Sequence, residues 1–201
     1  MLLPYNERME DWRRRTLLDA AGIARGMDAL AVRLQPKLTG RAVTVIPILG
    51  GAFVFAADLV RRLPPDLTLD FLRIQTYGTG TRPERAASPD WLPREENVRG
   101  RAILLLDDIL DTGRTLSAAR RLLLDEMGAA EVLVVVFVDK PVRREVPIRP
   151  DDCVLRLEQD SFLVGYGLDF QGAWRGLPDL VALELDAFGQ PIPALPATGA
   201  R

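Results

Sequence analysis

The chain has 201 residues, of which 48% are hydrophobic and 27% charged, as is usual for a soluble globular domain. A formal net charge of -2 disfavours broad attraction to nucleic acid or to an anionic membrane. The sequence has no histidine, which excludes His-based triads and a histidine base, and its single Cys153 excludes an internal disulfide. Because there is no signal-peptide pattern and no apolar run of roughly 18 residues, we expect a cytoplasmic protein that binds neither membrane nor nucleic acid.

The amino-terminal part of the chain predicts a helix, a strand and a second helix. Apolar residues recur every three to four positions between 6 and 35, which favours an amphipathic helix. Residues 42–49 are apolar and partly β-branched, so they predict a strand, and a helical pattern resumes over 52–62. Gly50 and Gly51 lie between these two elements. A glycine pair there lets a ligand approach the backbone closely, although it can equally be a tight connection.

Residues 101–116 carry the pattern around which the rest of the chain is organised. Five apolar residues, 102–106, predict a strand that is buried on both faces inside a parallel sheet. Asp107 and Asp108 follow side by side at its carboxyl end. Adjacent strand residues point to opposite faces, so both carboxylates cannot be directed into the core. A buried strand alone does not explain this pair.

A turn that suits a phosphate follows the acid pair. It consists of Asp111, Thr112, Gly113, Arg114 and Thr115, and a helical pattern begins directly after it. A glycine flanked by hydroxyl residues at a helix amino terminus offers free N–H groups and little bulk. An isolated Asp-Thr-Gly would be interpreted as a helix cap. With two carboxylates upstream that can accept hydrogen bonds from vicinal hydroxyls, the segment instead predicts a site for a ribose 5-phosphate.

The stretch from 76 to 99 lacks periodicity and is rich in proline, glycine and charge. It follows a predicted strand at 67–74. Stretches of this length inside a domain are typically disordered or functional. Because this one lies just ahead of the predicted phosphate-binding strand, we expect a mobile loop that closes over the site.

A second fully buried strand is predicted at 132–138, and Lys140 stands just beyond it. The alternation of strands and helices predicts a parallel sheet with ligands at the carboxyl ends of its strands. The glycine pair, the acid pair and Lys140 would then meet at one edge. Arg143 and Arg144 follow. Such a pair usually lies on the solvated surface, but near a bound phosphate one of them would neutralise negative charge.

The carboxyl-terminal part predicts two more strands, at 151–157 and at 180–185, and a tail rich in proline, alanine and glycine from 186 onward. We expect the end of this tail, residues 191–201, to be disordered.

The central pattern resembles the phosphoribosyl-pyrophosphate motif of type I phosphoribosyltransferases, which is an apolar strand, two acids, two variable residues and Asp/Glu-Thr-Gly-x-Thr. Every position is filled. From about 43 to 183 the chain is similar to hypoxanthine-guanine phosphoribosyltransferases. The further matching segments are Leu49-Gly50-Gly51 with 55–59, 70–73 with Tyr77-Gly78, Asp139-Lys140-Pro141 with 143–145, and Phe162-Leu163-Val164-Gly165-Tyr166-Gly167-Leu168-Asp169, followed by Arg175 and Leu177-Pro178.

The resemblance implies an α/β fold with a central parallel sheet flanked by helices and a small hood from the terminal segments. It implies one domain over 1–190, with a core at about 40–150, a hood from 1–40 and 151–185, and the mobile loop at about 76–99, which includes Tyr77. A homodimer or homotetramer is common among similar enzymes.

The resemblance also implies residue roles. Asp107 and Asp108 would hold the ribose hydroxyls, residues 111–115 the 5-phosphate, and Asp111 would be the general base near purine nitrogen 7. The pyrophosphate would meet Gly50, Gly51, Arg144 and Arg175. The purine would stack on Phe162, accept a hydrogen bond from Lys140 at its 6-oxo group and meet the Leu163 backbone. Asp169, with Asp107 and Asp108, would help to bind Mg²⁺.

The implied reaction is Mg²⁺-dependent transfer of the phosphoribosyl group from phosphoribosyl pyrophosphate to hypoxanthine or guanine. A lysine donor disfavours a 6-amino purine. Many relatives carry lysine where this chain has Gly50, so backbone N–H groups must suffice there. One alternative is an RNA-binding regulator on the same fold, which the net charge does not support. Another is an inactive relative, which the intact Asp111, Lys140 and Asp169 disfavour.

Overall fold

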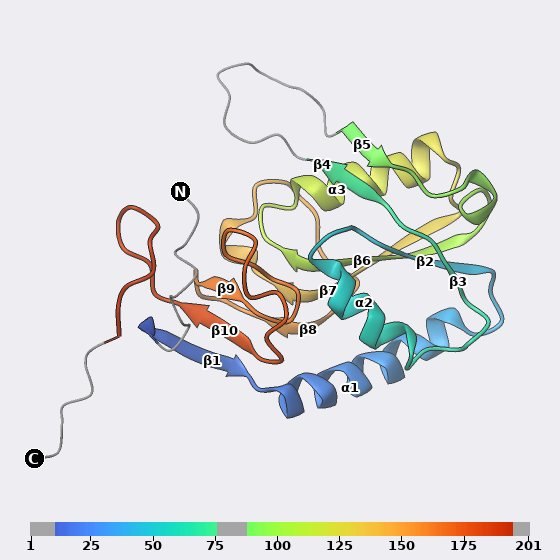
Figure 1. Cartoon of the computed structure of the whole chain (residues 1–201). Coiled ribbons are helices and arrows are strands. Elements are labelled where there is room, and N and C mark those ends of the chain that lie inside the picture. Colours follow the sequence, from blue (N-terminus) through green and yellow to red (C-terminus); the bar gives the residue numbers. More distant parts are fainter. Residues whose placement is uncertain (1–10, 76–87, 195–201) are drawn as a thin grey trace, which may run out of the picture. The chain divides into compact units, whose positions relative to one another are not determined.

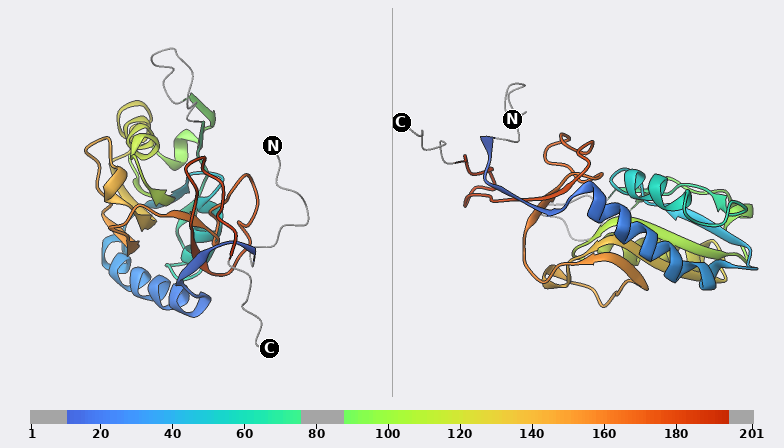
Figure 2. Two further views of the ribbon diagram at one scale, coloured as in Figure 1. Left: turned by 90° about the vertical axis from the view of Figure 1, so that its left-hand side faces the viewer. Right: turned by 90° about the horizontal axis from the view of Figure 1, so that it is seen from below.

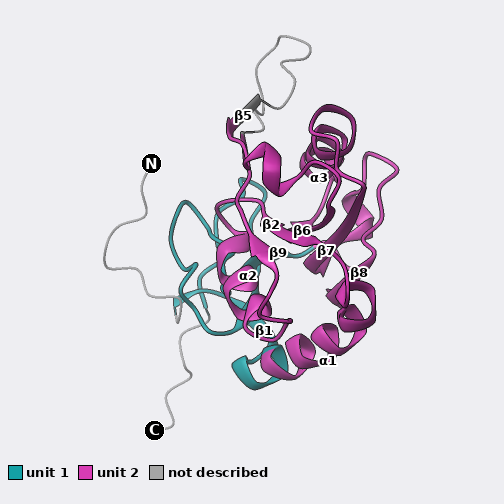
Figure 3. Cartoon of the chain, turned by 90° about the vertical axis from the view of Figure 1, so that its right-hand side faces the viewer, with its two compact units in different colours: residues 1–23, 161–201 teal, residues 24–160 magenta. Residues whose placement is uncertain are grey.

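A computed structural model describes residues 11–75 and 88–194 and divides the chain into two units (Figure 3). The larger unit is residues 24–160, and the smaller one combines 1–23 with 161–201. The predicted hood of 1–40 and 151–185 differs from the smaller unit at both boundaries. Most of helix α1 (Ala20–Leu38) belongs to the larger unit, and strand β8 (Asp152–Arg156) does too because it pairs with β7 (Glu131–Asp139).

The larger unit contains a five-stranded sheet in the order β3-β2-β6-β7-β8 (Figure 1). The remaining strands are β2 (Val43–Pro47), β3 (Thr68–Leu69) and β6 (Ala102–Leu110). Every neighbouring pair in this sheet is parallel. The predicted central parallel sheet is therefore confirmed. β6 extends further than predicted, so that the acid pair lies inside the strand.

Helices cover both faces of this sheet (Figure 2). Leu116 and Leu123, from α3 (Arg114–Arg121) and its π-helical continuation Leu122–Glu126, share one core cluster with Ile103 of β6 and Val136 of β7. Phe137, the next residue of β7, packs at 5.9 Å between ring centroids on Phe55 of α2 (Ala52–Val60). Since adjacent strand residues point to opposite faces, α2 lies across the sheet from α3.

The region from 67 to 99 contains more strand than predicted. The expected strand at 67–74 is divided between β3 and β4 (Arg73–Gln75). β4 pairs antiparallel with β5 (Ser88–Trp91), and a 3-10 turn, η2 (Glu95–Asn97), follows. The later part of the predicted loop is thus regular structure, because β5 finds a partner strand. Residues 76–87, with Tyr77, lie outside the described residues.

The smaller unit contains an antiparallel sheet in the order β1-β10-β9. Its strands are β1 (Arg14–Leu18), β10 (Leu180–Leu183) and β9 (Phe162–Val164). The prediction of a helix from residue 6 is wrong for β1, because pairing with β10 prevails over the local periodicity. Residues 191–194 belong to the predicted disordered tail, yet Pro191 and Pro193 form β-bridges. Among residues 11–75 and 88–194, no helix has the length and apolarity needed to cross a bilayer.

Candidate active site

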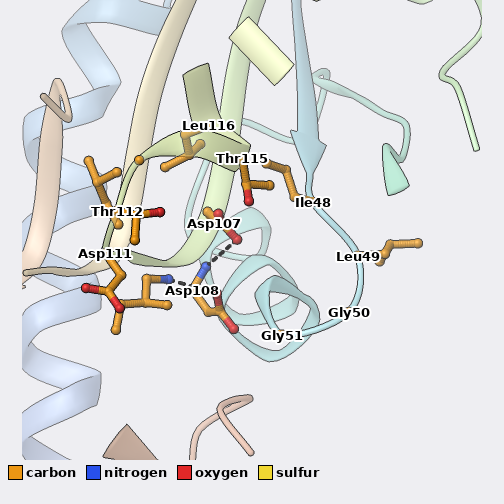
Figure 4. A pocket seen from close by; sticks show the side chains of 13 residues that line it. Ile48, Leu49, Gly50, Gly51, Asp107, Asp108, Asp111, Thr112, Thr115 and Leu116 are labelled. Atoms are coloured by element: carbon orange, nitrogen blue, oxygen red, sulfur yellow. Dashed lines mark hydrogen bonds between the residues drawn. The ribbon is translucent and has the colours of Figure 1, made fainter. Parts of the chain in front are cut away.

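A cavity of about 280 Å³ lies at the carboxyl ends of β2 and β6 in the larger unit (Figure 4). Its lining comes from three segments: the end of β2 with Gly50 and Gly51, the end of β6 with Asp107 and Asp108, and the turn before α3. The Leu49–Gly50 peptide bond is cis, and a Cβ built on Gly50 would meet nothing within 4 Å. This volume lies just below the range of about 300–1,000 Å³ that is usual for small-molecule sites.

The two carboxylates of β6 differ in burial. Asp107 is 8% exposed, whereas Asp108 is only partly buried. The Asp108 N–H donates to Asp107 Oδ1 at 3.0 Å, and the Ile109 N–H donates to Asp108 Oδ1 at 2.8 Å. Burial, and then the neighbouring charge of Asp108, raise the pKa of Asp107 well above its ordinary value. A ligand that brings positive charge or hydroxyl donors to this pair would therefore be favoured.

The turn between β6 and α3 has a shape that only glycine allows at its centre. Gly113 has φ +84° and is the residue before α3. A Cβ there would lie 2.5 Å from Ile148 Cγ2 and 2.9 Å from Val146 Cγ2. The turn therefore packs directly on residues that follow β7, and both the backbone conformation and the available space require glycine.

Arg144 stabilises the backbone of this turn. Its guanidinium donates to the carbonyl oxygens of Asp111 at 2.9 Å, Leu110 at 3.0 Å and Ile148, and to Asp139 Oδ1 at 2.6 Å. Asp139 is 2% exposed. These contacts use four of the five N–H donors of the guanidinium, so Arg144 holds the turn in place. That Arg144 also binds pyrophosphate stays a prediction.

Asp111 faces the cavity with a carboxylate that is only partly satisfied. Asp111 Oδ2 lies 3.3 Å from Nη1 of Arg143. Asp111 Oδ1 is buried and has no hydrogen-bond partner among residues 11–75 and 88–194. A buried carboxylate oxygen without a partner in the protein is unusual and is a candidate acceptor for a ligand donor.

Lys140 lies at the end of β7, ahead of the short 3-10 turn η4 (Pro141–Arg143). It is 3% exposed, and its Nζ lies 3.1 Å from Asp160 Oδ1. Its N–H donates to the Leu110 carbonyl at 3.0 Å, which ties the end of β7 to the end of β6. Lys140 is not part of the lining of the acid-pair cavity.

The remaining predicted residues belong to the smaller unit. Phe162 is 36% exposed, and its ring meets Phe170 edge-on at 5.5 Å. Phe170 in turn stacks on Trp174 at 6.1 Å between centroids. Asp169 Oδ1 is 2.5 Å from Arg175 Nη2, so the predicted metal ligand and the predicted pyrophosphate ligand pair with one another. Leu163, the third predicted purine residue, is 6% exposed.

Comparison with known proteins identifies the family of the chain. Residues 14–171 match the phosphoribosyl transferase domain family. A hypoxanthine-guanine phosphoribosyltransferase of Lactococcus lactis is 34% identical over 157 residues, which are 78% of this chain and 84% of that protein. This chain belongs to the hypoxanthine-guanine phosphoribosyltransferases.

Two further relatives agree with this family. A hypoxanthine-guanine phosphoribosyltransferase of Aquifex aeolicus is 34% identical over 170 residues, which are 84% of this chain and 93% of that protein. The crystal structure of a hypoxanthine phosphoribosyltransferase of Staphylococcus aureus has a TM-score of 0.81 and 28% identity, and the match covers 90% of this chain and 97% of that one. The parallel sheet is thus that of the type I phosphoribosyltransferase fold.

Within this phosphoribosyltransferase, the cavity of the larger unit is lined by all but one of the residues predicted to bind the ribose and the 5-phosphate, namely Asp107, Asp108, Asp111, Thr112, Gly113 and Thr115. Gly50 and Gly51, which are predicted to meet the pyrophosphate, line it too. Arg114 is the exception, because its exposed side chain pairs with Glu145 at 2.5 Å between Nη2 and Oε2. The meeting of Lys140 with Phe162 stays a prediction.

Sequence reasoning missed the residues that support these groups. Asp139 was noted only as part of a matching segment, yet it forms a buried ion pair with Arg144. An acid at the end of an otherwise apolar strand, followed five residues later by an arginine, was a usable signal. Phe170 and Trp174, which back the ring of Phe162, gave no such signal, because a pair of aromatic residues four apart is common in any core.

Proposed function

We propose that this phosphoribosyltransferase transfers the 5-phosphoribosyl group from phosphoribosyl pyrophosphate to hypoxanthine or guanine, with Mg²⁺, to give IMP or GMP and pyrophosphate. The observation that carries this proposal is the convergence of an acid pair and a phosphate-shaped turn on one cavity. The names of the Lactococcus and Aquifex relatives support a purine as the acceptor.

The sugar half of the substrate would occupy the cavity of the larger unit. Thr112, Gly113 and Thr115 would surround the 5-phosphate with hydroxyl groups and backbone N–H groups at the start of α3. Asp107 and Asp108 would accept hydrogen bonds from the two ribose hydroxyls. The pyrophosphate would meet the backbone of Gly50 and Gly51, where this chain lacks the lysine that many relatives carry.

The base half would be bound by Lys140 and by the segment that begins at Phe162. An exposed phenylalanine face offers a stacking surface for the purine plane. A buried lysine ammonium rewards an oxygen acceptor at carbon 6 and is left poorly paired by an amino group, which favours 6-oxopurines over adenine.

The carboxylates predicted to hold Mg²⁺ are hard oxygen donors of the kind that this cation prefers. The pKa of Asp107 is raised by its burial and by Asp108, so a divalent cation nearby would relieve the unfavourable proximity of the two carboxylates. Within residues 11–75 and 88–194, no group of three or more acids, cysteines or histidines is arranged to hold a metal. The absence of such a group suits a cation that is held by one or two carboxylates together with substrate oxygens. Asp169 is the third candidate ligand, beside Asp107 and Asp108. When bound, Mg²⁺ would neutralise pyrophosphate charge.

The chain's own residues would act mainly by position and charge. Displacement of pyrophosphate by a purine ring nitrogen builds positive charge on the sugar, and the carboxylates of the cavity stabilise that charge. Asp111 would take the proton from purine nitrogen 7, with its buried Oδ1 as the acceptor. Arg175 would meet the pyrophosphate only after loosening its contact with Asp169.

The comparisons do not favour the RNA-binding regulator, since the relatives reported above are purine transferases by name. Assembly as a homodimer or homotetramer and a cytoplasmic location remain predictions.

The test is to incubate the protein with phosphoribosyl pyrophosphate and Mg²⁺ and with each of hypoxanthine, guanine, xanthine, adenine and uracil. We expect a nucleotide from hypoxanthine or guanine and none from adenine or uracil. The same reactions in excess EDTA should give no product. If no 6-oxopurine is converted, the proposed function is wrong.

A further inference from the structure

The segment of residues 143–148 touches almost every residue of the turn before α3. Arg144 binds the carbonyl oxygens of Leu110 and Asp111. The Glu145 N–H donates to the Thr112 carbonyl at 3.0 Å, and the side chains of Val146 and Ile148 close the space beside Gly113. Hydrogen bonds and packing with this segment therefore fix the conformation of the turn, although the two are far apart in the chain.

Within this segment Arg143 differs from its neighbours, because it contacts a side chain of the turn that faces the cavity. Its Nη1 lies 3.3 Å from Asp111 Oδ2. Arg144 fixes the backbone of Asp111, and Arg143 fixes its carboxylate. The side chains of Arg143 and Asp111 are 52% and 28% exposed. An ion pair this accessible contributes little to folding stability, so its effect is chiefly on orientation.

We propose that Arg143 is a positioning residue that holds the Asp111 carboxylate in one orientation for proton transfer from the purine. This inference rests on the proposed function and deepens it. With Oδ2 held by Arg143, Oδ1 remains the free oxygen, and Oδ1 is the buried atom that has no partner among the described residues. The carboxylate of an Asp can rotate about two side-chain bonds. Arg143 restricts that rotation before the purine binds, which is the kind of preorganisation that raises turnover.

A competing role for Arg143 is direct binding of a substrate phosphate. The two roles predict different kinetics. A phosphate ligand acts on the KM for phosphoribosyl pyrophosphate, because it contributes to the bound ground state. A residue that orients the general base Asp111 acts on kcat and leaves both KM values almost unchanged.

The experiment is a double-mutant cycle on the full chain, with hypoxanthine and phosphoribosyl pyrophosphate as substrates. The variants are Arg143→Met, Asp111→Asn and the double variant. Arg143→Lys tests whether a second cation of similar reach restores the effect. Arg149→Met is the matched control, because Arg149 is an exposed arginine directly after this segment and is not part of the lining of the acid-pair cavity.

We expect Arg143→Met to lower kcat by about three- to tenfold and to change each KM by less than about twofold. Arg143→Lys should recover most of this loss, and Arg149→Met should resemble the wild type. In the Asp111→Asn background, Arg143→Met should lower kcat by less than about 1.5-fold further, because its effect passes through the carboxylate.

Other results would overturn the inference. Equal losses from Arg143→Met in both backgrounds would show that Arg143 acts independently of Asp111, and a rise in the KM for phosphoribosyl pyrophosphate with unchanged kcat would make it a phosphate ligand. A thermal midpoint of Arg143→Met well below that of the wild type would assign it to folding. If the wild type converts hypoxanthine while Arg143→Met is equally fast, the inference fails and the proposed function stands; if the wild type converts no 6-oxopurine, the proposed function itself fails.

Discussion

The turn of residues 110–115 and the segment of residues 162–175 are both predicted to bind substrate, but their shapes are fixed in different ways. Arg144, Val146 and Ile148, which lie far along the chain, hold the turn in place. The later segment is held by residues nearer in the chain: β9 pairs with β10, Phe170 contacts the rings of Phe162 and Trp174, and Arg175 donates to the Gly167 carbonyl at 2.6 Å. Distant substitutions should therefore disturb the turn, whereas the later segment should respond to substitutions close to it in the chain.

We expect the largest effect on turnover when the proposed general base in the turn, Asp111, is replaced. Asp111→Asn should lower kcat by about 10²- to 10⁴-fold, because an amide cannot accept the proton from the purine. The affinity for phosphoribosyl pyrophosphate, measured by calorimetry, should change far less. Equal losses of turnover and affinity would remove the assignment of Asp111 as the base and would leave it as a substrate ligand.

Arg144→Leu tests the support of the turn. It leaves the buried carboxylate of Asp139 with Arg156 alone, whose Nη1 is 3.4 Å away. We expect the free energy of unfolding in urea to fall by about 2–4 kcal/mol, since an uncompensated buried charge is costly. The control Arg149→Leu, at an exposed arginine directly after the segment, should stay within about 0.5 kcal/mol of the wild type. Unchanged stability with lost pyrophosphate binding would instead support the prediction of Arg144 as a ligand.

A matched pair of glycines compares the two regions directly. Gly113 and Gly172 have nearly the same φ, +84° and +85°. A Cβ would meet Ile148 at 2.5 Å in the first case and nothing within 4 Å in the second. Gly113→Ala should cost about 2–4 kcal/mol and Gly172→Ala about 1 kcal/mol, because only the first adds a clash to the backbone strain. Equal costs in urea unfolding would mean that the packing of the turn on its distant segment is unimportant.

The smallest effect is expected in the aromatic stack. Trp174→Leu removes the ring behind Phe170 and should loosen Phe162. An aromatic pair is worth about 0.5–1.5 kcal/mol, so the KM for hypoxanthine should rise about 2- to 10-fold while that for phosphoribosyl pyrophosphate stays unchanged. Trp174→Phe, which keeps a ring at the position, should behave like the wild type. A comparable rise in both KM values would contradict a role for this stack on the base side alone.

The same contrast explains what the sequence could predict. Strands β2, β6, β7 and β8 and the glycine and acid motifs were predicted because their signals are local: apolar runs and turn residues. β1 was predicted as helix because only its pairing with β10, more than 160 residues later, makes it a strand. The contacts of Arg144 with the turn could not be predicted for a related reason. A sequence shows that a cation is near a binding motif, but not whether carbonyl oxygens of the protein already occupy its donors.

Amide hydrogen exchange most directly tests the claim that the two regions bind different halves of the substrates. Exchange should be measured on the wild type alone, with phosphoribosyl pyrophosphate and Mg²⁺, and with IMP. We expect the first ligand to slow exchange over residues 107–115 and to leave residues 162–166 unchanged, and IMP to slow exchange over both. If phosphoribosyl pyrophosphate protects residues 162–166 and leaves 107–115 unchanged, the division between a sugar-phosphate turn and a base segment is wrong.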